Sequence, residues 1–145
     1  MLQREPFLIL PEPWAWLLVR AACSVRMPEG MPWQGRGVTC FVAAAAEMLP
    51  AEELRAVRKW ARLDLPMRDE FVPGAVHGWA TFDVIEGRAP AGSPPAYGPG
   101  AWGVLPTGDG QLYQAGSWTL PSPPAVGWHR LFAVPPQQPV QLSLL

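Results

Sequence analysis

The sequence predicts a mainly-β domain of the α+β class, a small closed or nearly closed β-barrel of about five or six strands with two flanking helices. Short apolar stretches recur along the chain, and 19 prolines and 14 glycines separate them. Helical periodicity is confined to two stretches. A length of 145 residues suits a single domain over 1–145 with one hydrophobic core. We expect the central part of the domain to span about 7–136.

The first expected elements are a strand and a helix. The apolar run FLIL at 7–10 ends at a proline, as a short buried strand does. Pro13 then stands where the first turn of a helix accepts proline, and Glu12 lies near the positive end of the helix dipole. The stretch WAWLLVRAA continues as a helix. Its expected apolar face consists of Trp14, Leu17 and Leu18.

A second helix and further strands are expected after a Pro- and Gly-rich loop at 24–37. The clearest helix is PAEELRAVRKWARL at 50–63, with two glutamates in its first turn and basic residues near its end. The tail at 137–145 has no periodicity and is expected to be loosely attached. The further strands are expected at 37–46, 72–87, 101–105, 111–120 and 127–134.

Composition and charge narrow the classes of function. The net charge is −1, so nucleic acid would have to bind a local basic patch rather than an overall basic field. No apolar run approaches the roughly 20 residues of a membrane span. Prolines precede the first apolar helix and Arg20 interrupts it, which does not match a signal peptide. We therefore expect a cytoplasmic protein without a membrane partner.

The two cysteines, Cys23 and Cys40, are expected to be buried reduced thiols, although a disulfide across a separation of 17 positions stays open. Their spacing from each other and from the two histidines is not that of metal ligands. The sequence therefore predicts neither a metal nor a cofactor.

Four stretches carry a family resemblance by their order. They are PEPWAWLL, PWQGRGVTCFVAAA, PGAVHGWATFDV, and YGPGAWGVL with LPSPPAVGWHRLFAVP. In this order they resemble the ASCH family of PUA-like β-barrels, over about residues 7–136. The resemblance implies a single ASCH/PUA-like domain that binds RNA or a nucleotide, with PEPWAWLLVR capping the barrel.

The chain departs from the family's signature, Gly-x-Lys-x-x-Glu-x-Arg. Ala21 falls at the glycine position, Cys23 at the lysine, Arg26 at the glutamate and Pro28 at the arginine. Family members that hydrolyse RNA or acylated cytidine use that lysine, so the resemblance implies a binding module rather than an enzyme. Two alternatives stay open: a hydrolase of this type with replaced catalytic residues, and a protein-interaction module that has lost the ligand site.

A basic and aromatic pocket is predicted between the first helix and the 24–37 loop. Arg20, Arg26 and Arg36 lie within 17 residues, and Trp33 lies among them. Guanidinium groups bind phosphate or carboxylate bidentately, and an indole offers a stacking face for a base. The sequence therefore predicts contacts to a nucleotide-sized ligand or RNA. In the alternative interpretation, Arg20 and Arg36 are solvated or paired with Glu12, Glu29 or Asp83. Trp33 then belongs to the core.

The weak catalytic candidates are Cys23 and His77, since a thiolate beside an imidazole can attack a carbonyl. Nothing in the sequence places the two side chains together. In the alternative interpretation, Cys23 is a buried residue and His77, inside the strand AVHGW, pairs with a neighbouring side chain.

Overall fold

The computed structural model describes residues 4–21, 23–28, 35–61, 65–85, 102–104, 110–114 and 116–132. Within them, one β-sheet is accompanied by two α-helices and a short 3₁₀ helix, which confirms a mainly-β α+β protein. The elements are β1 (Arg4–Leu10), α1 (Trp14–Arg20), β2 (Val25–Arg26), β3 (Gly35–Ala44), α2 (Ala51–Ala61), η1 (Arg68–Glu70), β4 (Val76–Ile85), β5 (Trp102–Val104), β6 (Gly110–Leu112) and β7 (Gly127–Phe132).

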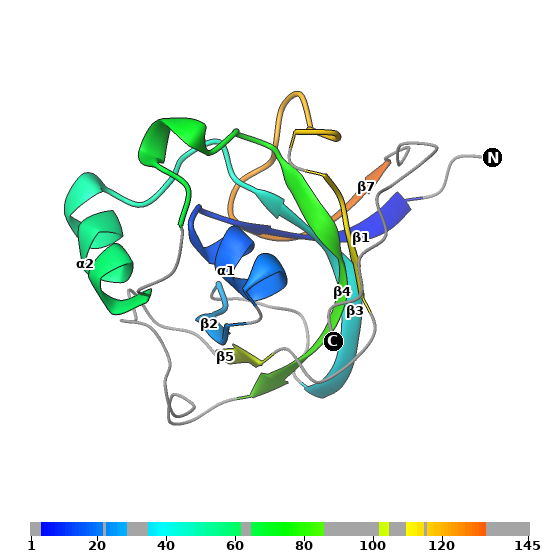
Figure 1. Cartoon of the computed structure of the whole chain (residues 1–145). Coiled ribbons are helices and arrows are strands. Elements are labelled where there is room, and N and C mark those ends of the chain that lie inside the picture. Colours follow the sequence, from blue (N-terminus) through cyan, green and yellow to red (C-terminus); the bar gives the residue numbers. More distant parts are fainter. Residues whose placement is uncertain are drawn as a thin grey trace.

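The sheet has the strand order β2-β5-β4-β3-β1-β7, and β6 pairs with β4 beside that path. β1 runs parallel to β3, with Phe7 opposite Phe41, whereas the other described pairs are antiparallel. Among the described residues the path is not closed into a barrel, because the end strands β2 and β7 pair only with β5 and β1. The sheet nevertheless curves around α1 (Figure 1).

Residues 7–10 of the strand β1 are buried on both faces, as their uninterrupted apolar run predicts. Leu8 and Leu10 face the core that holds α1. Phe7 and Ile9 face a second cluster on the other side, where the Phe7 and Phe41 rings stack 5.0 Å apart. The predicted apolar face of α1 is correct, and its buried residues are Trp14, Ala15, Leu17, Leu18 and Val19.

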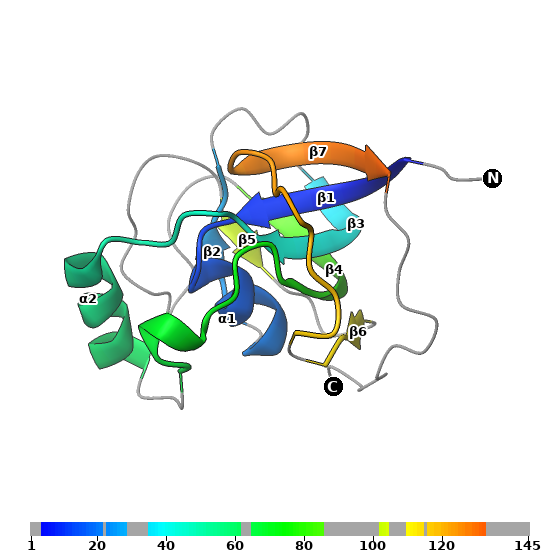
Figure 2. The same cartoon turned by 90° about the horizontal axis from the view of Figure 1, so that it is seen from above.

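The helix α2 lies on the far side of α1 from β3 and β4 (Figures 1 and 2). Leu54 and Val57 bury its apolar stripe in the core around α1. In the last turn of α2, Arg58 donates hydrogen bonds to the carbonyls of Leu65 and Pro66. These bonds hold the start of the 65–75 segment, which leads through η1 into β4.

Two predicted elements differ from the structure. The expected loop at 24–37 contains a short strand, β2, whose partner β5 is far away in the sequence. The strand expected at 111–120 shrinks to β6 and an isolated bridge between Thr119 and Ala75. Gly116 adopts a positive φ of 77° between them, which ends the extended backbone. The 137–145 tail lies outside the described residues.

No helix in the described ranges has the length and apolar character needed to cross a membrane.

Candidate functional site

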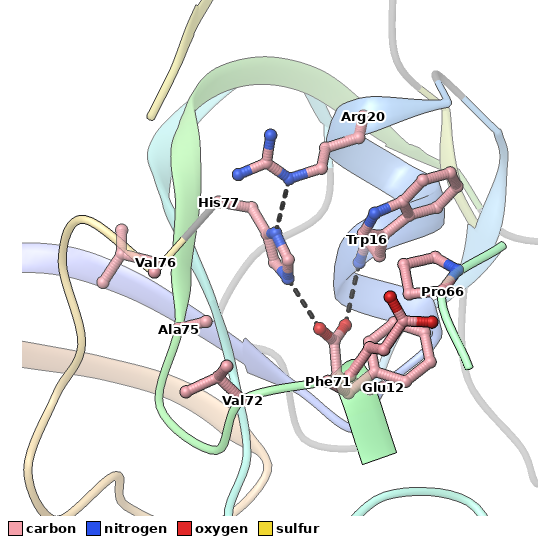
Figure 3. Close-up of a pocket in the computed structure, with 11 residues that line it drawn as sticks. Glu12, Trp16, Arg20, Pro66, Phe71, Val72, Ala75, Val76 and His77 are labelled. Carbon is pink, nitrogen blue, oxygen red and sulfur yellow. Dashed lines mark hydrogen bonds and ion pairs between the residues drawn. The ribbon is translucent and has the colours of Figure 1, made fainter. Parts of the chain in front are cut away.

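A cavity of about 270 Å³ lies between α1, the 66–72 segment and the start of β4. One wall is formed by Trp16, Pro66 and Phe71, and the opposite wall by small apolar side chains of 72–76 (Figure 3). The polar side chains in its lining are Glu12, Arg20, Glu70 and His77.

The turn from β1 into α1 places three of these residues. Trp16 and Arg20 are four positions apart on α1 and therefore share one face of the helix. Glu12 lies just before the helix, and its Oε1 accepts the backbone N–H of Trp16 at 3.0 Å. That N–H is one of the four at a helix start without a partner in the helix, so the carboxylate both stabilises the turn and lines the cavity.

A chain of hydrogen bonds runs along the cavity from Arg20 through His77 to Glu12 (Figure 3). Arg20 Nε and His77 Nδ1 are 2.8 Å apart, and His77 Nε2 and Glu12 Oε2 are 2.7 Å apart. Glu12 and His77 are only 2% and 5% exposed. A guanidinium can only donate, so Nδ1 accepts from Arg20 and the imidazole proton lies on Nε2, facing the carboxylate.

Arg20 connects this chain of hydrogen bonds to the segment that follows β6, the strand paired with β4. Its Nη2 donates to the carbonyl of Tyr113, which follows β6, at 2.6 Å. Burial lowers the pKa of Arg20, and the nearby Glu12 carboxylate opposes this shift. The guanidinium remains charged, because an arginine does not lose its proton in a protein. Among the described residues, no acceptor is bound to Nη1 of Arg20.

The structure supports the pairing alternative for His77, whereas Arg20 donates to His77 and to a backbone carbonyl rather than to an acid. His77 is a strand histidine that pairs with neighbouring side chains, and Arg20 is linked to Glu12 through it. Both ring nitrogens are thereby engaged, which leaves no free lone pair for a general base.

Cys23 has the features of a protonated thiol. Its Sγ lies 3.6 Å from the carbonyl oxygen of Ala21, to which it donates. Burial raises the pKa of the Cys23 thiol, whereas a nucleophilic cysteine requires a lowered pKa. This environment does not favour a nucleophilic Cys23 acting with His77. Cys40 is also a free thiol, buried in β3, and burial raises its pKa strongly.

The other predicted binding residues do not line this cavity among the described residues. Arg26 lies half-buried in β2, opposite Trp102 of β5. Arg36 belongs to β3, but its side chain and the whole of Trp33 lie outside the described residues. Of the predicted binding residues, the cavity therefore contains Arg20, and it also contains the catalytic candidate His77.

Sequence reasoning missed the aromatic wall and the role of Glu12. Trp16 and Arg20 are four residues apart, and this spacing predicts that they lie on the same face of the helix. The sequence indicates Glu12 as a helix-start acid and as one of three candidate acids for Arg20 and Arg36, but not as a lining residue. Phe71 lies in an irregular segment and carries no sequence signal.

Within the described residues, no group of three or more His, Cys, Asp or Glu side chains is arranged to hold a metal ion. No protein-family model matches the chain, and no curated protein sequence matches it significantly.

Proposed function

We propose that the protein is an RNA- or nucleotide-binding module of the PUA-like type, and that it holds one nucleobase in the cavity beside α1. The observation that carries this proposal is the buried chain from Glu12 through His77 to Arg20, which lies beside Trp16 and Phe71 in one cavity. Apolar and aromatic walls with a few placed polar groups are typical of small-molecule sites.

The size of the cavity supports a ligand no larger than a nucleoside. Its volume of about 270 Å³ lies just below the range of roughly 300–1,000 Å³ found for drug-sized ligands. Proteins that read single-stranded RNA splay a base out and stack it on an aromatic side chain. Trp16 and Phe71 offer such faces, and the buried polar chain offers donors and acceptors for a base edge.

The proposal extends to the predicted binding residues that do not line the cavity. In this proposal, Arg26 and Arg36 contact phosphate or carboxylate groups of the ligand, and Trp33 stacks on a second base. The curvature of the sheet around α1 supports a PUA-like barrel (Figure 1). The two free cysteines support a cytoplasmic location, where thiols stay reduced.

The test blocks the cavity without disturbing the core. Val72 lines the cavity and is 42% exposed, so Val72→Trp adds bulk at its mouth. Val126→Trp is the matched control, because Val126 is 44% exposed and lies outside the lining. Calorimetric titrations use a mixed-sequence single-stranded RNA and the four nucleoside 5′-monophosphates.

We expect the wild type and Val126→Trp to bind, and Val72→Trp to lose tenfold or more in affinity, which is about 1.4 kcal/mol. No binding of any probe by the wild type would overturn the proposal, as would equal affinities for the two variants. A second pair of titrations at two salt concentrations compares the wild type with Arg26→Ala/Arg36→Ala. A smaller salt dependence in the double variant supports phosphate contacts by these arginines.

A further inference from the structure

We infer that the cavity selects a base with two adjacent N–H donors on one edge, as guanine has, and leaves the phosphate outside. The inference rests on the proposed function and names the ligand of the same site. Three properties of the lining carry it: its charge, the acceptor capacity of Glu12 and the position of Arg20.

The charge of the lining disfavours a phosphate inside the cavity. Its described charged groups are the carboxylates of Glu12 and Glu70 and the guanidinium of Arg20, while His77 is neutral. One positive and two negative charges make a formal charge of −1. Phosphate sites instead gather arginines, lysines or backbone N–H groups. The base therefore enters the cavity, and the sugar and phosphate face its mouth.

The buried carboxylate of Glu12 has acceptor capacity left. Each oxygen accepts one bond from the protein, Oε1 from the N–H of Trp16 and Oε2 from Nε2 of His77. An ionised carboxylate offers about four acceptor positions, so about two remain. Both present donors are neutral groups, and a buried anion gains stability from every further donor. A ligand edge with two N–H groups can use these two remaining acceptor positions together.

Guanine differs from the other bases in this respect. Its N1–H and N2–H₂ donors are adjacent, so they can pair with a carboxylate together. Adenine and cytosine place an unprotonated ring nitrogen beside the amino group, and that lone pair would repel Glu12. Uracil has a single N–H between two carbonyls. The carboxylate therefore discriminates guanine from all three.

Arg20 complements the third group of the guanine edge. Guanine O6 is an acceptor next to N1–H, and arginine is its commonest partner in base recognition. Arg20 lies across His77 from Glu12 and keeps Nη1 unbound among the described residues. The imidazole of His77 thus separates a donor, Arg20, from an acceptor, Glu12. Guanine requires this order, because its acceptor O6 is followed by the donors N1–H and N2–H₂.

The experiment compares nucleosides on the wild-type protein by calorimetry. The probes are guanosine, inosine, which lacks the 2-amino group, 1-methylguanosine, which lacks N1–H, and adenosine. Guanosine 5′-triphosphate tests exclusion of phosphate, and agmatine tests for a cationic ligand. We expect guanosine to bind at least tenfold more tightly than inosine, 1-methylguanosine and adenosine, and more tightly than its triphosphate.

The outcomes separate this inference from the proposed function. If nucleosides bind but inosine or adenosine equals guanosine, base selection is wrong and the nucleotide-binding function stands. If neither RNA nor any nucleoside binds, the proposed function falls as well. If agmatine binds more tightly than guanosine, the site takes a cationic ligand and the inference is overturned.

A variant locates the selection on Glu12. Glu12→Gln is expected to reduce the guanosine preference over inosine to within about threefold, because an amide presents one acceptor instead of two oxygens. The matched control, Glu52→Gln, changes an exposed residue of α2 and is expected to keep the preference. A folded Glu12→Gln protein with the full preference would contradict the role of Glu12. The wild-type comparison of nucleosides decides the matter if Glu12→Gln does not fold.

Discussion

Arg20 and His77 face each other from α1 and β4, and Nε of the guanidinium donates to Nδ1 of the imidazole at 2.8 Å. This one bond determines the proton position of the ring, because Nδ1 has to accept. Nε2 then carries the proton and donates a hydrogen bond to Oε2 of Glu12. The arrangement holds a neutral histidine between opposite charges, which suits a binding site whose polar groups are fixed before the ligand arrives.

The tautomer of His77 is directly measurable. Long-range ¹H–¹⁵N correlation at neutral pH is expected to show a protonated Nε2 and an unprotonated Nδ1. Arg20→Met removes the donor, so the ring is expected to lose this strict preference. A wild-type spectrum with the proton on Nδ1 would contradict the hydrogen-bond chain.

Replacing Glu12 is expected to cost stability as well as selectivity. Both partners of its carboxylate are donors, whereas a glutamine side chain offers one oxygen and one NH₂ group. One buried donor therefore faces another in either orientation, and Glu12→Gln should lower the free energy of unfolding by about 1–3 kcal/mol. Urea denaturation measures the change. Glu52→Gln on exposed α2 should stay within about 0.5 kcal/mol, and an equal loss in both variants would refute the argument.

The buried thiol of Cys40 predicts a loss of stability at alkaline pH. Burial raises its pKa well above the ordinary value of 9.0, so the folded chain keeps the proton that the unfolded chain releases above pH 9. Stability is complete below that pH and falls above it, by about 1.4 kcal/mol per pH unit from this group. Denaturation at a series of pH values should show a smaller alkaline slope in Cys40→Ala. An unchanged slope would assign the effect to other groups, such as Tyr113, whose pKa burial also raises.

Gly78 is expected to tolerate no side chain. A Cβ at this position of β4 would overlap the carbonyl oxygen of Gln111 in β6 and approach Cγ1 of Val19 to 3.1 Å. Gly78→Ala should therefore separate β6 from β4 and cost roughly 3 kcal/mol. Thermal or urea unfolding measures the loss.

Gly116→Ala is the comparison for that variant. Gly116 also lies in a specific backbone conformation, with φ of 77°, but nothing lies within 4 Å of an added Cβ. Only the left-handed backbone is penalised there, at about 1 kcal/mol. Equal losses at Gly78 and Gly116 would show that the β4–β6 contact is less tight than described.

The elements that depend on local pattern could be predicted from the sequence. The apolar run at 7–10 predicts the buried strand β1, and apolar residues at helical spacing predict α1 and α2. The strand β2 could not be predicted, because its two residues become a strand only by pairing with β5. The 111–120 stretch has the composition of a strand, yet the positive φ of Gly116 divides it.

Only part of the candidate site could be predicted from the sequence. Arg20 and His77 were singled out by residue type, but 57 positions separate them, and only the packing of α1 against β4 brings them together. Phe71 lines the cavity from the irregular segment after α2, and Arg58 of α2 donates a hydrogen bond to the start of that segment. Contacts between residues so far apart in the chain produce no periodic pattern, so they cannot be predicted from a single sequence.

Binding of a nucleobase beside α1 is measured by an NMR titration with guanosine 5′-monophosphate. We expect the largest shift changes at the Trp16 indole, the Phe71 ring and the His77 ring, with smaller changes at Arg26 of β2. Saturable shifts at the first three residues would establish the site. No shift at these residues, or changes confined to the β2 side of the sheet, would contradict the account.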